Sequence, residues 1–322
     1  MKGKRTKRQQ LFRLSPVKRS SMEDFSQQQN TSSDVFASSH LFIVFNYCPL
    51  PGVWIAFTSY NFRDGIFGSP FVGLSNFEFL ISSGELWTLT KNTILYNLVF
   101  ILFGNVFQIV IALMLNEIRS KFFKKVSQTI MFLPYFISAV LIGAIAFNIL
   151  NYDTGALNAL LRETGADPIQ IYSKAGLWPF IIIFCNMWQQ TGYGSVVYFA
   201  AICGIDSSMV EAAEVDGATS WQRIRYIILP SLKGTFIILL LFALGGIMKG
   251  NFGLFWNLTG GANSQLFPTT DIIETFVYRT MTTQNNFATS SAVGLYQSIF
   301  GFVLVMFSNW VVKRLDPDYA LF

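Results

Sequence analysis

Charged residues and histidine are scarce in this sequence of 322 residues. Only 13% of the residues are charged, against roughly 25% in a soluble domain, whereas 52% are hydrophobic. His40 is the single histidine and the three cysteines form no CxxC pair, so neither a metal site nor a histidine-based catalytic triad is predicted. No GxxxxGK[ST] motif occurs, which excludes ATP binding through a P-loop on this chain. We therefore expect neither an enzyme nor a resident cofactor.

The apolar residues gather in blocks about 20 residues long, the length that a helix needs to cross a bilayer. These blocks predict six spans, of which Asn46, Pro49 and Pro51 interrupt the first and Pro134 kinks the third. The predicted spans cover residues 35–59, 92–116, 126–150, 176–203, 231–250 (or as far as Trp256) and 292–312. Outer segments carry two short predicted helices, 73–82 and 154–163, the second capped by Thr154. The chain is predicted to be an all-α polytopic membrane protein.

Lysine and arginine concentrate in alternate connecting segments. If the N-terminus lies inside, the segments on the inner side hold 17 of the 23 basic residues. The positive-inside rule therefore places both termini in the cytoplasm. The expected organisation is a basic and polar cytoplasmic segment (1–34), a first helix with an outer loop (35–91), a transmembrane domain (92–312) and a cytoplasmic tail (313–322).

The cytoplasmic loop 204–230 between the fourth and fifth spans shows a helix–turn–helix pattern. It reads GIDSSMVEAAEVDGATSWQRIRYIILP. Ser208 and Glu211 fit a capping box, Gly217 suits a left-handed C-terminal residue, and Ser220 can cap a second helix. Pro230 suits the first turn of the fifth span. Composition alone fits either an ordinary interfacial helix or a segment that docks a partner.

The spacing within this loop resembles the EAA motif of ATP-binding-cassette (ABC) importer permeases. That motif reads EAA, three residues, Gly, nine residues, I-x-L-P. It is matched at every position by Glu211, Ala212, Ala213, Gly217, Ile227, Leu229 and Pro230. Stretches such as YCPLPGVWIAFTSYNF (47–62) and FATSSAVGLYQSIFGFVLVMFSNWVVKRL (287–315) are similar to the carbohydrate-uptake group, above all to permeases of complex poly- and oligosaccharide systems. One departure is the polar region 14–40, where the group has an apolar lead-in.

This resemblance implies a type I ABC importer permease fold in the bacterial cytoplasmic membrane. The first helix of the loop would be the coupling helix, which inserts into a groove on a cytoplasmic ATPase subunit. The implied partners are two ABC ATPase subunits that bind ATP and Mg²⁺, a second related permease, an extracellular solute-binding protein and the lipid bilayer. No nucleic-acid partner is expected.

Polar side chains within spans are costly in lipid and are the candidates for contact with a substrate. In the fourth span they share one helical face, next to Trp188: Asn186, Gln189, Gln190 and Tyr193. Amides and aromatic rings suit sugars, although hydrogen bonding between helices explains the same face. Lys249, followed by Asn251, lies in the predicted fifth span. It fits contact with the carboxylate of an acidic oligosaccharide or snorkelling to the interface.

The predicted function is a permease subunit that forms half of the translocation pathway of an ATP-driven importer. The expected substrates are oligosaccharides, with acidic ones as a candidate class. An ABC permease for a non-sugar solute is the first alternative. An ion-coupled secondary transporter is a weaker one, because such a protein would need carboxylates within the membrane and none lies deep in a clear predicted span.

Overall fold

The computed structural model describes residues 39–315, and these are mainly helical, with one isolated β-bridge between Thr58 and Phe71. The chain divides into two units, residues 1–52 and 53–322. In the first unit, residues 39–46 are helical and a turn follows at 47–49. A candidate span runs over Ser39–Phe57, whose last part is the 3₁₀ helix η1, Leu50–Phe57. Pro49 and Pro51 lack a backbone N–H, which explains why the α-helix stops before them. The predicted segment 1–34 and the start of the first span lie outside the described residues.

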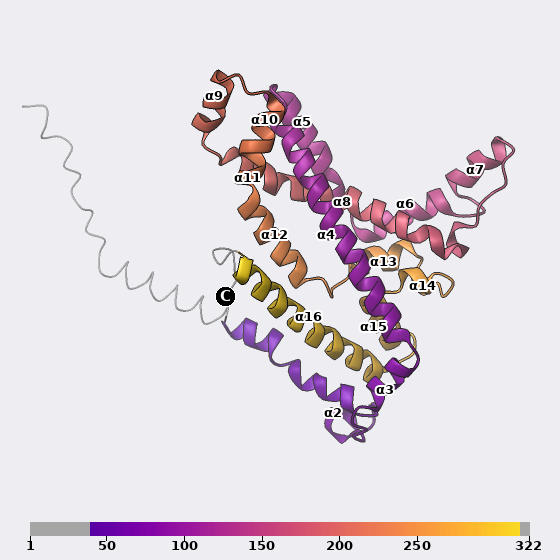
Figure 1. Ribbon diagram of the computed structural model, residues 1–322. Helices are drawn as coiled ribbons and strands as arrows, with labels where there is room; N and C mark the ends of the chain where they lie inside the picture. The colour runs from indigo at the N-terminus through magenta and orange to yellow at the C-terminus, as the bar shows by residue number, and fades with distance from the viewer. Residues whose placement is uncertain (1–38, 316–322) are drawn as a thin grey trace, which may run out of the picture. The chain divides into compact units, whose positions relative to one another are not determined.

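The second unit is a series of helices joined by short connections (Figure 1). Its α-helices, with their bounds, are α2 (Gly65–Gly68), α3 (Ser75–Ser82), α4 (Glu85–Glu117), α5 (Lys121–Phe132), α6 (Ala139–Leu150), α7 (Ala156–Glu163), α8 (Trp178–Cys203), α9 (Ser207–Val215), α10 (Ser220–Arg223), α11 (Leu229–Ser231), α12 (Lys233–Gly245), α13 (Phe252–Leu258), α14 (Phe267–Thr270), α15 (Ile273–Thr282) and α16 (Phe287–Leu315). Three short 3₁₀ helices, η2 (Leu133–Phe136), η3 (Ile171–Ser173) and η4 (Ala175–Leu177), and one π-helix, η5 (Ile224–Ile228), lie between them.

Six membrane spans are found when each bent helix pair counts as one. Ser39–Phe57, α4 and α16 are each long and apolar enough to cross a bilayer alone. The other three candidates are pairs of helices bent by 91°, 72° and 54° at a short break. The all-helical prediction is therefore confirmed, and the prediction of about six spans holds when each pair counts once. Only the first of these bends lies in the interior of a predicted span, whereas the other two lie where α8 and α12 join the helices of the loop 204–230. The second and sixth spans also begin earlier than predicted, at Glu85 and Phe287.

The third span is broken, where the sequence predicted only a kink at Pro134. Residues Leu133–Phe136 form a 3₁₀ turn, and α6 leaves it at 91° to the preceding helix. Pro134 cannot donate to the helix ladder, and Ser138 has an extended backbone and caps α6 by accepting from the Leu141 N–H at 3.3 Å. Because the cap at Ser138 lies only four residues after Pro134, the chain starts a second helix there and does not continue α5 through a kink.

The predicted fifth span is wrong at its C-terminal end. α12 stops at Gly245 and α13 begins at Phe252, so neither the end at 250 nor the extension to Trp256 is continuous helix. Two adjacent glycines, Gly245 and Gly246, lower helix propensity there. Thr154 is likewise not a helix cap, because Gly155 takes that position and the Thr154 hydroxyl donates to Asn151 Oδ1 at 3.2 Å.

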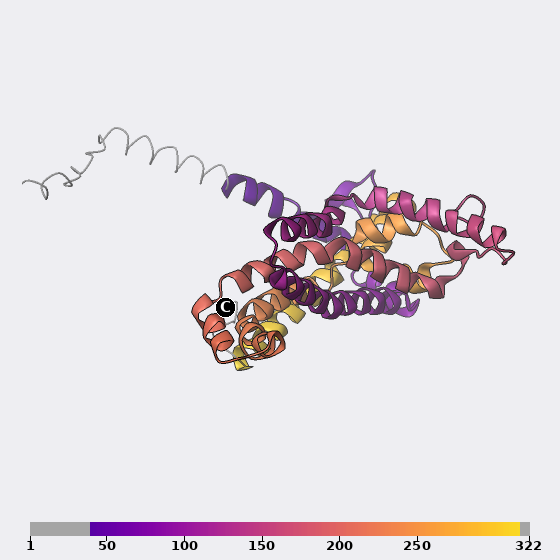
Figure 2. The same ribbon diagram turned by 90° about the horizontal axis from the view of Figure 1, so that it is seen from above.

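Small residues allow the spans to approach closely. α8 packs along α4 and also contacts α5 and the turn η2, and α13 packs against α6 (Figures 1 and 2). A Cβ on Gly192 would lie 1.8 Å from the Met131 carbonyl oxygen, and one on Gly194 would overlap the Gln108 amide. Interfaces of this kind in membranes depend on such residues. The core between these helices contains the fully buried Trp178 and Tyr198.

Candidate functional site

The loop after α8 has the helix–turn–helix form that its sequence predicts, with different caps. Asp206, one residue before α9, accepts from the Ser208 N–H at 2.9 Å, so the predicted Ser208 cap is wrong. This hydrogen bond lowers the pKa of the Asp206 carboxyl. Thr219, rather than Ser220, caps α10, in a reciprocal capping box with Gln222. Asp and Thr are as suitable as Ser for the N-cap position of a helix. Asp206 and Thr219 each lie directly before the first helical residue, and this is why they are the caps.

The turn between the two loop helices is held firmly. Gly217 has a φ of +80°, as predicted, and the Ala218 N–H donates to the Ala213 carbonyl at 2.9 Å. Arg223 on α10 forms an ion pair with Glu214 on α9. The two helices and their turn therefore behave as one unit.

The EAA-motif residues lie partly around a shallow pocket of about 340 Å³ and partly on the surface. Ala213, Gly217 and Ile227 line the pocket. Glu211 and Ala212 are exposed on α9, and Leu229 and Pro230 are exposed beyond the π-helix. Next to the motif, three large apolar side chains are exposed, namely Val215 (88%), Tyr226 (70%) and Trp221 (66%). Exposed apolar groups on a polar loop are typical of a surface that meets another protein.

The loop is anchored in the core of the membrane helices. Ile228 and Leu232 are buried against Tyr198 of α8 and Ala112 of α4. The Tyr198 hydroxyl in turn donates to Asn105 Oδ1 of α4 at 2.5 Å. A force on α9 would therefore act on two spans at once.

The polar face predicted on the fourth span is divided among different environments. Asn186 and Gln189 are buried, and Gln189 donates to the Ile137 carbonyl at 2.9 Å, at the break before α6. Gln190 is half-buried, and Tyr193 stacks on Tyr135 with ring centroids 4.4 Å apart. For Gln189 the structure favours the helix–helix alternative, because its amide satisfies a carbonyl freed by the break. Substrate contact by the other members stays a prediction.

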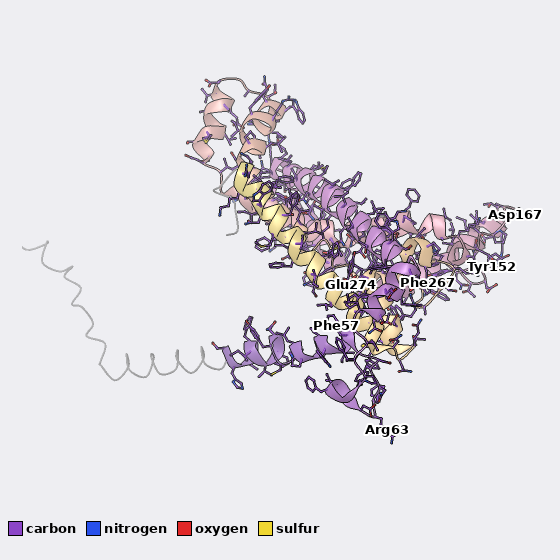
Figure 3. The ribbon with its side chains drawn as sticks, turned by 60° about the horizontal axis from the view of Figure 1, so that its bottom comes forward. Phe57, Arg63, Tyr152, Asp167, Phe267 and Glu274 are labelled. Carbon is purple, nitrogen blue, oxygen red and sulfur yellow. The ribbon has the colours of Figure 1, made fainter. Side chains whose placement is uncertain are left out.

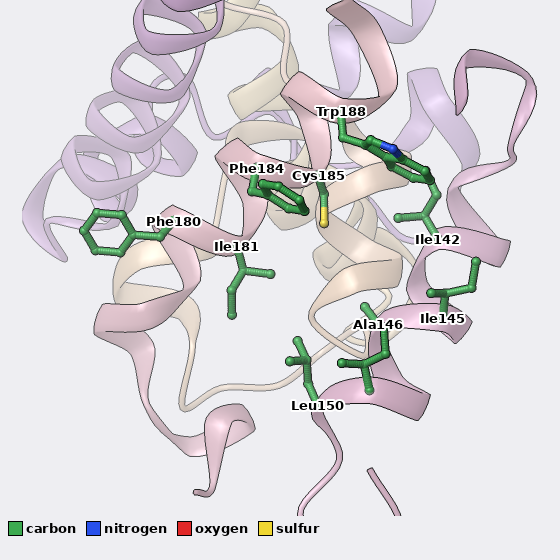
Figure 4. Close-up of a pocket in the computed structure, with 10 residues that line it drawn as sticks. Ile142, Ile145, Ala146, Leu150, Phe180, Ile181, Phe184, Cys185 and Trp188 are labelled. Carbon is green, nitrogen blue, oxygen red and sulfur yellow. The ribbon is translucent and has the colours of Figure 1, made fainter. Parts of the chain in front are cut away.

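Trp188 lies away from that polar face, in an apolar groove between α6 and α8. The groove has a volume of about 510 Å³, and Figure 4 shows Trp188, Cys185 and Phe184 of α8 opposite Ile142 and Ile145 of α6. Apart from the Trp188 indole N–H and the Cys185 thiol, its lining residues carry no polar group for a saccharide hydroxyl. This position is less suited to a sugar than the sequence indicated.

Lys249 lies in the non-helical connection between α12 and α13, not inside a span. Its side chain is exposed, and no acidic side chain among residues 39–315 lies within ion-pair distance of it. Asn251, the other predicted contact in this region, uses its Oδ1 to cap α13 by accepting from the Leu254 N–H at 3.2 Å.

Three side chains from three helices satisfy the backbone of this connection, and we call them the linker clamp: Asn97 of α4, Glu274 of α15 and Gln297 of α16. Asn97 Nδ2 donates to the carbonyls of Ile247 and Lys249, both at 3.0 Å. Glu274 Oε1 accepts from the Gly250 N–H at 2.7 Å, and Gln297 Nε2 donates to Met248 O at 2.5 Å and to Glu274 Oε1 at 2.7 Å. The clamp holds the Lys249 backbone on both sides.

Sequence reasoning missed Glu274, because it assigned the segment after Trp256 to an outer loop. No local pattern shows that this carboxylate meets Gln297, and only the packing of α15 on α16 brings the two together. Figure 3 shows Glu274 among the side chains of these helices.

A buried ion pair also orders the segment after Trp256, which the sequence predicted to be an outer loop. Arg279 makes two hydrogen bonds to Asp271, at 2.7 and 3.0 Å, and lies 3.9 Å from the centre of the Phe267 ring. Asn92 of α4 donates to the Asp271 carbonyl at 2.9 Å. The segment is therefore built structure that is fastened to a span.

Comparison with known proteins gives consistent matches. Residues 101–320 match the family model described as binding-protein-dependent transport system inner membrane component. Protein LplB of Bacillus subtilis (strain 168) is 31% identical over 277 residues, which cover 86% of each chain. The polygalacturonan/rhamnogalacturonan transport system permease protein YteP of the same strain is 33% identical over 278 residues, covering 86% of this chain and 85% of that protein.

Solved structures share the fold. One is a bacterial alginate ABC transporter in complex with a periplasmic protein carrying an alginate pentasaccharide. It has a TM-score of 0.79 and 31% identity, and the match covers 91% of this chain and 97% of that chain. Another, a bacterial ABC transporter involved in the import of the acidic polysaccharide alginate, has a TM-score of 0.80 and 30% identity, covering 92% and 99%.

Proposed function

We propose, from the premise that this chain belongs to the family of binding-protein-dependent transport system inner membrane components, that it is the permease subunit of an ABC importer for acidic oligosaccharides. It would form half of the translocation pathway, with both termini and the loop 204–230 in the cytoplasm. Its partners would be two ABC ATPase subunits, which bind ATP and Mg²⁺, a second related permease and an extracellular solute-binding protein.

The observation that carries this proposal is the loop that contains α9 and α10. It presents exposed apolar side chains beside a glycine turn, and the Glu214–Arg223 ion pair and the hydrogen bond from the Ala218 N–H to the Ala213 carbonyl join its two helices. Closure of an ATPase dimer against α9 would push on a unit whose end, through Ile228, is buried against α8 and α4. Movement at the ATPase would therefore reach the spans without a flexible intermediate, which is what alternating access requires.

Two considerations support acidic saccharides as the substrate class. A relative is described as transporting polygalacturonan and rhamnogalacturonan, and a structural neighbour as importing the acidic polysaccharide alginate. In this chain, Lys249 is an exposed cation whose backbone is fixed by the linker clamp. A positive charge on a non-helical stretch between membrane helices suits a carboxylate that passes through a water-filled pathway.

The proposal is tested by co-expressing the chain with its candidate ATPase, second permease and binding protein, and reconstituting the complex in liposomes. We expect ATP-dependent uptake of alginate or galacturonate oligosaccharides to exceed uptake of uncharged oligosaccharides of equal length. Purification of the chain without any ATPase, or uptake that needs no ATP, would contradict the proposal.

Gly217→Trp tests the loop directly, because it combines a bulky side chain with a positive φ at the turn. We expect normal insertion but loss of ATPase co-purification or of substrate-stimulated hydrolysis. Gly165→Trp is a matched control, since Gly165 also has a positive φ (+77°) and no neighbour within 4 Å of a Cβ, but lies in the turn after α7. Equal behaviour of the two variants would remove the loop from its proposed role.

A further inference from the structure

Three aromatic rings form a cluster that begins three residues after Lys249, in which Phe252 and Trp256 are stacked and Tyr278 lies tilted or edge-on to them. Phe252 and Trp256 lie one turn apart on α13, with ring centroids at 5.8 Å. Tyr278 of α15 completes the group, at 4.8 Å from Phe252 and 4.9 Å from Trp256. We call this group the aromatic platform. Tyr278 is 39% exposed, and Phe252 and Trp256 are half-buried, so the rings keep free surface.

The exposure of the platform is not needed for packing α13. That helix buries its opposite side, with Leu254, Phe255 and Leu258 almost fully inaccessible. The platform itself is held in place, since the Gly261 N–H donates to the Trp256 carbonyl at 2.8 Å and a Cβ on Gly261 would lie 3.3 Å from the indole. Rings that are fixed and still accessible are pre-organised to receive a flat ligand surface.

The depth of this region argues that the platform adjoins water rather than lipid. The linker clamp includes Asn97, which lies in the apolar part of α4, twelve residues after its first residue, so the clamp lies within the span and not at its end. Non-helical backbone at such depth persists only where protein buries it or where it lines a water-filled cavity. Lys249 at the same connection carries an exposed charge, which lipid would oppose.

Lys249 and the platform are close by chain length alone. Three peptide units separate Lys249 from Phe252, so their Cα atoms are at most about 11 Å apart. A pyranose ring has an apolar face of CH groups that stacks on aromatic rings, and a uronate adds a carboxylate to the same ring. The connection 249–252 therefore keeps a cation within about 11 Å, between Cα atoms, of the first ring of the platform.

We propose that Phe252, Trp256 and Tyr278 form a stacking subsite for a pyranose ring of the transported saccharide, with Lys249 beside it for the carboxylate. This inference rests on the proposed function. Stacking would act on neutral and acidic rings alike, whereas Lys249 would discriminate between them. The two contributions can therefore be separated by experiment.

In the test, labelled uronate oligosaccharides and labelled neutral oligosaccharides are titrated onto the complex of the two permeases and the ATPase subunits. The ATPase is arrested with vanadate, and the binding protein is left out so that it does not compete for the sugar. Trp256→Ala should raise the half-saturating concentration by about twofold to twelvefold for both sugars, the fold-change that corresponds to about 0.5–1.5 kcal/mol for one aromatic contact. Trp256→Phe, which keeps a ring and is the safer variant for folding, should recover most of the binding. Trp87→Ala is the matched control, because Trp87 is 73% exposed at the outer end of α4, and it should change nothing.

Three outcomes would overturn the subsite. Unchanged binding by Trp256→Ala would show that the indole does not touch the sugar. Lower membrane insertion with unchanged binding would make Trp256 an interfacial anchor, and loss of the second permease on purification would make it a subunit contact. If the unmutated complex binds and transports no oligosaccharide, the proposed function fails instead.

Discussion

Gly192 is the position where the structure predicts the largest effect from a single added methyl group. In Gly192→Ala the new Cβ would lie 1.8 Å from the Met131 carbonyl oxygen, about 1.6 Å short of the 3.4 Å at which ordinary contact begins. Both partners are helix backbone, so no side chain can rotate away. α8 would have to move from α5, which also strains the nearby hydrogen bond from Gln189 to the Ile137 carbonyl.

Overpacking of this kind costs about 1–3 kcal/mol, which corresponds to a fall in Tm on the order of 5 °C. The measurement is thermal unfolding of the purified chain in detergent, followed by the tryptophan fluorescence and by aggregation. Gly104→Ala is the matched control, because Gly104 also lies in a span but its nearest neighbours, the ends of Gln108 and Met187, are 3.8 Å from a Cβ. That variant should be neutral, or more stable by up to about 1 kcal/mol through helix propensity. Equal midpoints for the two variants would refute the close approach of α8 and α5.

Three further predictions concern the connection between α12 and α13 and the outer segment. Glu274→Ala removes the acceptor of the Gly250 N–H and should reduce sugar uptake at least tenfold. Glu274→Gln keeps an acceptor oxygen and should retain most of the uptake; equal losses in the two variants would refute the role of the linker clamp. Lys249→Met should lower uptake of uronate but not of neutral oligosaccharides, as measured in liposomes, and unchanged uronate uptake would exclude the charge contact. Arg279→Met leaves the Asp271 charge buried without its cation, so stability should fall by about 3–5 kcal/mol, measured as a lower Tm. The double variant with Asp271→Asn should recover part of this loss, and no recovery would refute the pairing.

The positions of the spans could be predicted because the bilayer imposes a simple requirement. A span needs about 20 apolar residues, and this pattern is visible in the sequence without any knowledge of packing. The turn at Gly217 was predictable for a similar local reason, since glycine tolerates the positive φ that ends α9. The caps were less predictable, because the sequence offers two suitable residues close together at the start of each helix: Asp206 and Ser208, and Thr219 and Ser220. The backbone conformation at each position decides which of them caps the helix.

The candidate substrate contacts were only partly predictable. Helical spacing placed Gln189 and Tyr193 on one face, but the break before α6 gave Gln189 a carbonyl to satisfy and left Tyr193 stacked on Tyr135. Lys249 was recognised as an unusual charge, yet its place outside any helix depends on where α12 ends. Spacing describes a single helix, and these environments are created by its neighbours.

The sequence alone determined that the chain crosses a membrane several times and that one loop matches the EAA spacing, since both follow from residue types at fixed intervals. The tertiary structure decided which spans are broken and how the breaks are satisfied. Asn97, Glu274 and Gln297 are far apart in the chain, and they form the linker clamp only because α4, α15 and α16 pack around one non-helical connection. Backbone groups within a membrane must find partners, and which side chains supply them depends on the fold.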